Sequence, residues 1–292
     1  MLLRARRELP QFGQEVTRRP PVPQLKPSET SMRKIGPAQA LFALSLAALA
    51  VLSTRYGNFA PLIAATALPA KATYVFATLL VAACAGLFVS RTVAVSAITI
   101  AICALGWAAV TIPPIAHAPL SVGSWFGLSE AMSTLVGVWT LYALDRRRDH
   151  AASAGAMTGD GALRLGRILF GGACLVFGIS HFAYAAYSLP YVPTWLPARL
   201  SLVYITGACH VAAGVGLILG VLPRLAAMLQ AVMIVLFGLL VWLPSHFANP
   251  VPQWAGSPQN QWSETFLNFV LAAVAWMIAD SLRSQRQSDR RA

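Results

Sequence analysis

Eight long stretches of this sequence are almost free of charged residues, and they constrain the fold more than any other feature. Each is close to the length of about 20 residues that an α-helix needs to cross the hydrocarbon of a bilayer. The whole chain is 57% hydrophobic and only 11% charged, whereas a soluble domain is about 25% charged. We therefore expect an all-α polytopic membrane protein, surrounded by a lipid bilayer, with about eight transmembrane helices. The stretches are 38–54, 73–90, 92–113, 127–144, 165–187, 201–222, 225–244 and 264–280.

The basic residues are concentrated on one side of the predicted membrane. With the N-terminus placed inside, all of the 22 Lys and Arg residues except Arg55, Lys71 and Arg199 fall on the inner side. Such a bias marks the cytoplasmic face, so both termini are expected in the cytoplasm. Because this pattern explains the net charge of +12, nucleic acid is not an expected partner. The excess of Arg over Lys suggests a bacterial inner (plasma) membrane.

Three polar segments flank and separate the apolar stretches. Residues 1–36 are basic, proline-rich and non-periodic, which predicts a disordered cytoplasmic tail. Residues 146–163 are rich in Gly, Ala and Arg and are expected to be a flexible cytoplasmic linker. Residues 283–292 form a second basic tail.

The two halves of the chain repeat each other. Ile112-Pro113 matches Leu243-Pro244, Ser129-Glu130 matches Ser263-Glu264, and Asp145 matches Asp280, all in the same order. One duplication explains these matches, and it gives a degenerate first unit at 37–145 and a second unit at 164–282. Since each unit has four predicted spans, we expect two tandem four-helix bundles of the same orientation.

Polar residues within the second unit gather at one predicted depth. His181 and His210 lie in the outer parts of the fifth and sixth spans, and His246 follows the seventh. Glu264 opens the eighth span, and Asn268 lies one turn deeper. Because ionisable side chains are costly within hydrocarbon, they are the best functional pointers in a membrane sequence. They predict a site at the outer end of the second bundle.

Small residues on the fifth and sixth spans indicate which way the two histidines face. Gly171, Cys174 and Gly178 precede His181 at helical spacing, and Gly207 and Gly214 flank His210. Such stripes allow helices to approach closely, so both imidazoles are expected at a helix contact.

The first unit serves as an internal comparison. Where the second unit has its three histidines, the first has Asn58, Leu80 and Ile115, but it keeps an acid at Glu130. The imidazoles are therefore not needed to build the bundle, and the second unit is the expected functional one. Glu130 and Glu264 are equally well explained as acids stabilised by helix N-termini.

Aromatic residues crowd the same outer level. Interfacial anchoring explains most of them, but a ring-lined ligand pocket would use the same residues, and both explanations remain open. The residues are Tyr184, Tyr187, Tyr191, Trp195, Trp242, Trp254 and Trp262.

The second unit resembles a known family. The runs Gly166-Arg167-Ile168-Leu169-Phe170, Gly178-Ile179-Ser180-His181-Phe182 and Val192-Pro193-Thr194-Trp195-Leu196-Pro197, with Asn249-Pro250, are similar to the DoxX family of small four-helix membrane proteins. The resemblance covers about 164–282. It implies a subunit of a quinone-linked oxidoreductase and a soluble or membrane-bound oxidoreductase as partner. The doubled unit departs from the family pattern, so no stoichiometry is carried over.

These observations give two hypotheses. In the first, His181, His210 and Glu264 exchange protons with a quinone or a similar amphipathic ligand, because imidazole titrates near neutral pH. Further ligand contacts are expected from His246, Trp195, Asn268 and Asn249. Ligation of haem or a metal by the three histidines is a weaker variant, since no Cys–His spacing supports it. In the second hypothesis, the chain is a non-enzymatic scaffold, transporter component or assembly factor with purely structural polar residues.

Overall fold

The computed structural model describes residues 35–58, 70–148 and 157–289. Within these ranges every regular element is helical and no β-strand occurs. The predicted N-terminal tail, except for its last two residues, and the middle of the predicted linker lie outside the described residues.

Long helices coincide with the apolar stretches of the sequence. They are α1 (Pro37–Tyr56), α2 (Ala70–Gly86), α3 (Val93–Val110), α5 (Phe126–Arg148), α6 (Asp160–Ala183), α8 (Arg199–Leu219), α9 (Pro223–Phe237) and α11 (Pro258–Asp289). Short elements join them: α4 (Ile112–His117), η2 (Val122–Trp125), α7 (Ala185–Ser188), η3 (Leu189–Tyr191), the π-helical turn η4 (Gly238–Trp242), α10 (Leu243–Ser245) and η5 (Gln253–Ala255).

Six helical segments of the described chain are long and apolar enough to span a membrane, which agrees with the prediction of an all-α membrane protein. Helix α2 is shorter than these six, and α5 ends in the charged run Asp145–Arg148. The expectation of eight spans therefore stays a prediction. The six segments are Pro37–Tyr56, Val93–His117, Asp160–Ala183, Arg199–Leu219, Pro223–Ser245 and Pro258–Arg283.

Proline and glycine set several helix boundaries. Helix α1 starts with Pro37, where a missing N–H costs nothing, and Gln39 Oε1 accepts the Gly36 N–H at 3.1 Å. At the far end of α8, Gly220 has a φ of 76°, a left-handed conformation that glycine adopts without strain. Pro223 begins α9 directly afterwards. These residues confine the α8–α9 connection to a tight turn.

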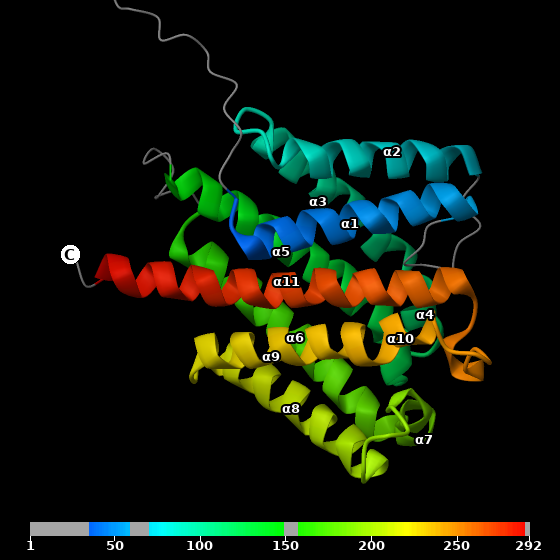
Figure 1. The fold of residues 1–292 in the computed structure, drawn as a ribbon. Coiled ribbons are helices and arrows are strands. Elements are labelled where there is room, and N and C mark those ends of the chain that lie inside the picture. Colours follow the sequence, from blue (N-terminus) through cyan, green and yellow to red (C-terminus); the bar gives the residue numbers. More distant parts are fainter. Residues whose placement is uncertain (1–34, 59–69, 149–156, 290–292) are drawn as a thin grey trace, which may run out of the picture. The chain divides into compact units, whose positions relative to one another are not determined.

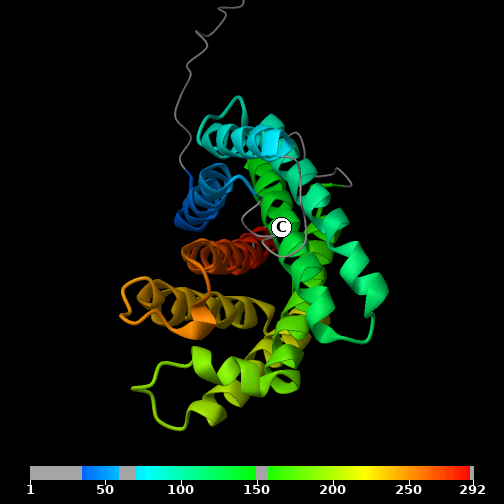
Figure 2. The same cartoon turned by 90° about the vertical axis from the view of Figure 1, so that its right-hand side faces the viewer.

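The fourth helix of each half, α5 or α11, joins the two halves of the protein. Within a half, consecutive helices pack on each other, as α6 does on α8 and α9 does on α11. However, α1 packs along α11 and α6 packs along α5, so each first helix lies against the fourth helix of the other half. Figures 1 and 2 both show α11 between α1 and α9. The halves thus interlock through α5 and α11, which also contact each other.

Small residues allow α5 and α11 to approach closely. A Cβ added to Gly137 of α5 would lie 2.5 Å from a methyl carbon of Val274 on α11 and 2.8 Å from the ring of Phe42 on α1. Helix α11 also carries buried alanines on several of its sides, including Ala272, Ala273, Ala275 and Ala279. Helices with small residues at their contact gain dispersion energy from close packing, which drives association in lipid.

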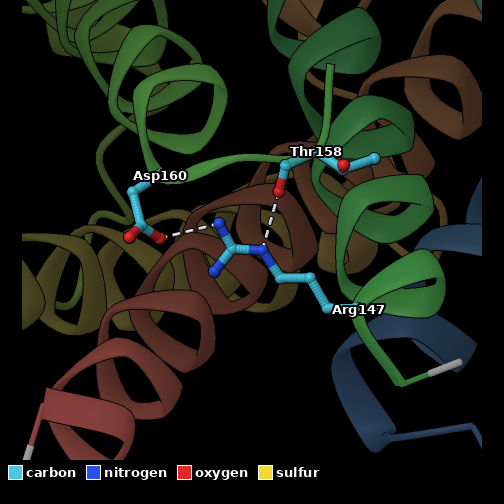
Figure 3. Close-up of polar contacts among 3 residues, drawn as sticks. All are labelled: Arg147, Thr158 and Asp160. Atoms are coloured by element: carbon cyan, nitrogen blue, oxygen red, sulfur yellow. Dashed lines mark hydrogen bonds and ion pairs between the residues drawn. The ribbon is translucent and has the colours of Figure 1, made fainter. Parts of the chain in front are cut away.

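Arg147, near the end of α5, contacts residues at the far end of the predicted linker. Its Nε donates to the Thr158 carbonyl oxygen at 2.7 Å, and its Nη2 forms an ion pair with Asp160 Oδ1 at 2.7 Å (Figure 3). Trp139 Nε1 also donates to the Met157 carbonyl oxygen at 2.8 Å. The expectation of a flexible linker at 146–163 stays a prediction. In the structure, α5 extends to Arg148, α6 begins at Asp160, and the residues just before α6 are anchored to α5.

Candidate functional site

A cavity of about 390 Å³ lies at the end of the protein where α7 and η3 connect α6 to α8. Its walls come from α6, α8, α9 and α11, with further residues from the first turns of α5 and from the η3 region. Figure 1 shows α8 and α9 close together at their connecting turn and diverging toward the end that carries α7. Most of the lining is apolar. Its polar lining residues include His181, His210, Glu130, Glu264 and Asn268.

Four glycines bring α6 and α8 together beside this cavity. A Cβ on Gly178 would lie 2.8 Å from the Gly207 carbonyl oxygen, and a Cβ on Gly214 would lie 2.7 Å from the Gly171 carbonyl oxygen. Two backbones this close leave no room for a side chain between them. The structure therefore confirms the close approach that the glycine stripes predict, and it brings the two histidines to one place.

The imidazole rings of His181 and His210 face each other across the α6–α8 contact. Their centroids are 5.2 Å apart, with the ring planes tilted by 44°. Phe237 of α9 stacks on His181 with a centroid separation of 6.1 Å and lies 5.8 Å from His210. His210 is buried, and His181 is half-buried. These ring contacts restrict the orientations of both imidazoles.

Hydrogen bonds give the two neutral rings opposite roles. His181 Nδ1 lies 2.8 Å from the Phe177 carbonyl oxygen. A carbonyl can only accept, so Nδ1 carries the proton and Nε2 of the neutral ring is an acceptor. His210 Nδ1 lies 2.7 Å from the amide nitrogen of Gln230, which can only donate. Nδ1 of His210 therefore accepts, and its Nε2 carries the proton as a donor.

Gln230 is a site residue that the sequence argument missed. It is buried on α9 and restricts the orientation of His210 through the hydrogen bond to Nδ1. A signal was available, because Gln230 is a polar residue in the middle of the otherwise apolar stretch 225–244.

Two carboxyl groups, from different halves of the protein, face the cavity. Glu264 lies in the second turn of α11, and Glu130 lies in the second turn of α5. Both residues are part of the lining of this one cavity. Asn268, predicted to lie one turn deeper than Glu264, donates through Nδ2 to the Glu264 backbone carbonyl oxygen at 2.8 Å and also lines the cavity. The sequence assigned the site to the second unit alone, whereas the first unit contributes Glu130.

The other expected ligand contacts lie outside the cavity lining. His246 stacks on Trp262 at 3.7 Å between ring centroids, and its Nε2 lies 3.4 Å from Thr265 Oγ1. Trp195 is 70% exposed and Asn249 is also exposed. These three residues do not line the cavity. Their predicted role at the ligand gains no support from their positions.

Of the seven tyrosines and tryptophans that crowd the outer level in the sequence, Tyr191 and Trp242 line the cavity. Trp254 packs edge-on against Tyr191, with 4.9 Å between ring centroids. Burial raises the pKa of the Tyr191 hydroxyl, and the nearby Glu264 carboxyl raises it further. The tyrosine therefore remains a neutral hydrogen-bonding group at physiological pH.

The donor set does not resemble a metal centre. Within the described ranges, no group of three or more His, Cys, Asp or Glu residues is arranged to hold a metal ion. His246 is separated from the imidazole pair, since it packs on Trp262 and Thr265 of α11.

The comparison with known proteins bears on the second half only. Residues 170–279 match the family model of a domain of unknown function, DUF8561. The match runs from α6 to α11, so it includes His181, His210 and Glu264 but leaves Glu130 outside. No curated protein and no solved structure matches the chain. The resemblance to the DoxX family stays a prediction.

Proposed function

We propose that this protein binds the head group of a quinone, or of a similar amphipathic molecule, in the cavity between α6, α8, α9 and α11. The observation that carries the proposal is the pair of oriented imidazoles. His210 offers a hydrogen-bond donor and His181 offers an acceptor, with ring centroids 5.2 Å apart. A quinone carbonyl can accept a hydrogen bond from His210. A quinol hydroxyl can also donate a hydrogen bond to His181. Because one neutral ring donates and the other accepts, the pair can hydrogen-bond both redox forms of such a head group without either ring changing its charge.

The size and polarity of the cavity support an amphipathic ligand. Its volume of about 390 Å³ lies within the range of about 300–1,000 Å³ typical of small-molecule sites. Two of its apolar lining residues, Leu236 and Leu240, are also exposed on the outer surface of α9 and η4. In a bilayer this surface faces lipid. An apolar tail can therefore remain among acyl chains while the head group reaches the imidazoles.

We further propose that all eight long helices cross the bilayer, as two four-helix repeats with both termini in the cytoplasm. The distribution of Lys and Arg supports this orientation. Under it, the cavity opens near the outer face of a bacterial inner membrane. The resemblance to the DoxX family adds the expectation of a redox complex, in which a soluble or membrane-bound oxidoreductase exchanges electrons with the ligand.

The test is binding of a short-chain ubiquinone analogue to the protein purified in detergent, followed by quenching of tryptophan fluorescence. Trp242 lines the cavity and supplies a local signal. We expect His181→Ala and His210→Ala each to weaken binding about tenfold, the equivalent of about 1.4 kcal/mol. His117→Ala is the matched control, because His117 is exposed on α4, outside the cavity lining. Unchanged affinity in both cavity variants would end the proposal.

A further inference from the structure

The cavity contains a feature that the imidazole pair does not explain. Glu130 and Glu264 occupy matching positions in the two repeats, each following a serine and each in the second turn of its helix. Their helices, α5 and α11, pack against each other. Two copies of one side chain, one from each repeat, therefore line the same cavity.

No basic side chain neutralises these acids within the cavity. The titratable residues of the lining are the two glutamates, His181, His210 and Tyr191, and the lining includes no Lys or Arg. Helix α3, which packs on α5, carries no Lys, Arg, His, Asp or Glu. Arg224 lies in the first turn of α9, whereas the residues of α9 that line the cavity lie toward its last turns. Arg55, the basic residue at the end of α1, is exposed. Among the described residues that line the cavity, no Lys or Arg compensates the charge of the two carboxylates.

We propose that Glu130 and Glu264 hold a single shared proton and form a proton-holding subsite beside the head-group site. Two carboxylates that line one largely apolar cavity repel each other, and binding of one proton by the pair removes this repulsion. The subsite needs one residue from each half, so it is complete only in the doubled chain. Its relation to a ligand rests on the proposed function, whereas the shared proton does not.

The pair also sets the charge of molecules that the cavity accepts. With one proton bound it keeps one negative charge, which disfavours anionic head groups and favours neutral or hydrogen-bond-donating ones. A quinol hydroxyl meets this condition, because it can donate to the ionised oxygen of the pair. A carboxylated or phosphorylated head group does not.

Infrared spectroscopy of the purified, detergent-solubilised protein tests the shared proton directly. A protonated carboxylic acid has a carbonyl stretching band distinct from that of a carboxylate, and the band shifts in D₂O. At pH 7 we expect this band in the wild type, and we expect Glu130→Gln and Glu264→Gln each to remove or shift it. Asp160→Asn is the control, since the Asp160 side chain is 75% exposed and paired with Arg147; the band should remain unchanged.

The outcomes separate this inference from the proposed function. A wild-type spectrum without the band at pH 7, or a band that survives in both glutamine variants, overturns the shared proton even if quinone binds. Loss of the band in either variant supports it even if the quinone analogue fails to bind. If a glutamine variant does not fold, Glu130→Asp replaces it: the acid is kept but moved, so the band should shift rather than persist unchanged.

Discussion

His181 and Gly207 pack so closely that a Cβ on Gly207 would lie 2.7 Å from the Cβ of His181. The residues that form the site are therefore also the residues that let α6 and α8 cross. The glycine provides the space in which the imidazole of His181 reaches His210. Helix packing and ligand binding should fail together when this crossing is disturbed.

Substitution of Gly178 tests the crossing. Gly178→Ala would place a methyl group 2.8 Å from the Gly207 carbonyl oxygen and 2.8 Å from the Val211 backbone nitrogen. Overpacking against backbone typically costs about 1–3 kcal/mol, so we expect a loss of stability of about 2 kcal/mol. Unfolding in mixed micelles by a denaturing detergent measures it. Gly172→Ala is the control, because nothing lies within 4 Å of its added Cβ. Equal stability of the two variants would contradict the packing argument.

Gln230 is predicted to determine the tautomer of His210. In Gln230→Glu the donor at His210 Nδ1 is replaced by an acceptor, so the ring should move its proton to Nδ1 and lose the donor at Nε2. We expect about tenfold weaker binding of the oxidised quinone analogue, whose carbonyls only accept, and a smaller effect on the quinol. Fluorescence titration with both redox forms measures the difference. The exposed Gln253, changed to Glu, is the control. Equal losses for the two forms would count against an assigned tautomer.

Residues outside the cavity should not contribute to binding. Trp195→Ala and Asn249→Ala alter exposed side chains that do not line it. We expect the affinity for the quinone analogue to change less than twofold, or about 0.4 kcal/mol. Phe237→Ala removes a ring that stacks on His181 and lines the cavity, so it should weaken binding clearly. A large effect of Trp195→Ala would place the ligand nearer the outer surface than we propose.

His246 is predicted to make stability depend on pH. Burial lowers the pKa of His246 in the folded protein, an effect that a hydrogen bond to the Gln261 backbone partly offsets. Below the unfolded pKa of about 6.5, the unfolded state therefore binds more protons, so stability falls as the pH drops. Thermal unfolding at pH 7.5 and pH 5.5 should show a smaller decrease for His246→Asn than for the wild type. An identical decrease would show that His246 is not protonated on unfolding.

Much of the fold follows from local sequence. An uncharged apolar stretch such as 201–222 must satisfy its backbone hydrogen bonds internally when it enters lipid, and only a helix does so within one segment. Pro223 and Gly220 end one helix and start the next for reasons of backbone geometry alone. The positions of the helices, the close approach at Gly178 and Gly207, and the neighbouring imidazoles of His181 and His210 were all predictable on these grounds.

Only the tertiary structure decided which distant helices share a surface. The duplication predicts two tandem bundles but not how they touch, because contact between α5 and α11 depends on side-chain volumes at positions such as Gly137 and Val274, which lie far apart in the sequence. That contact brings Glu130 into a cavity otherwise built from the second half, while the stacking of His246 on Trp262 holds that imidazole away from it. Hydropathy and periodicity are properties of one segment, whereas a site is a property of the surfaces that several segments bury against one another.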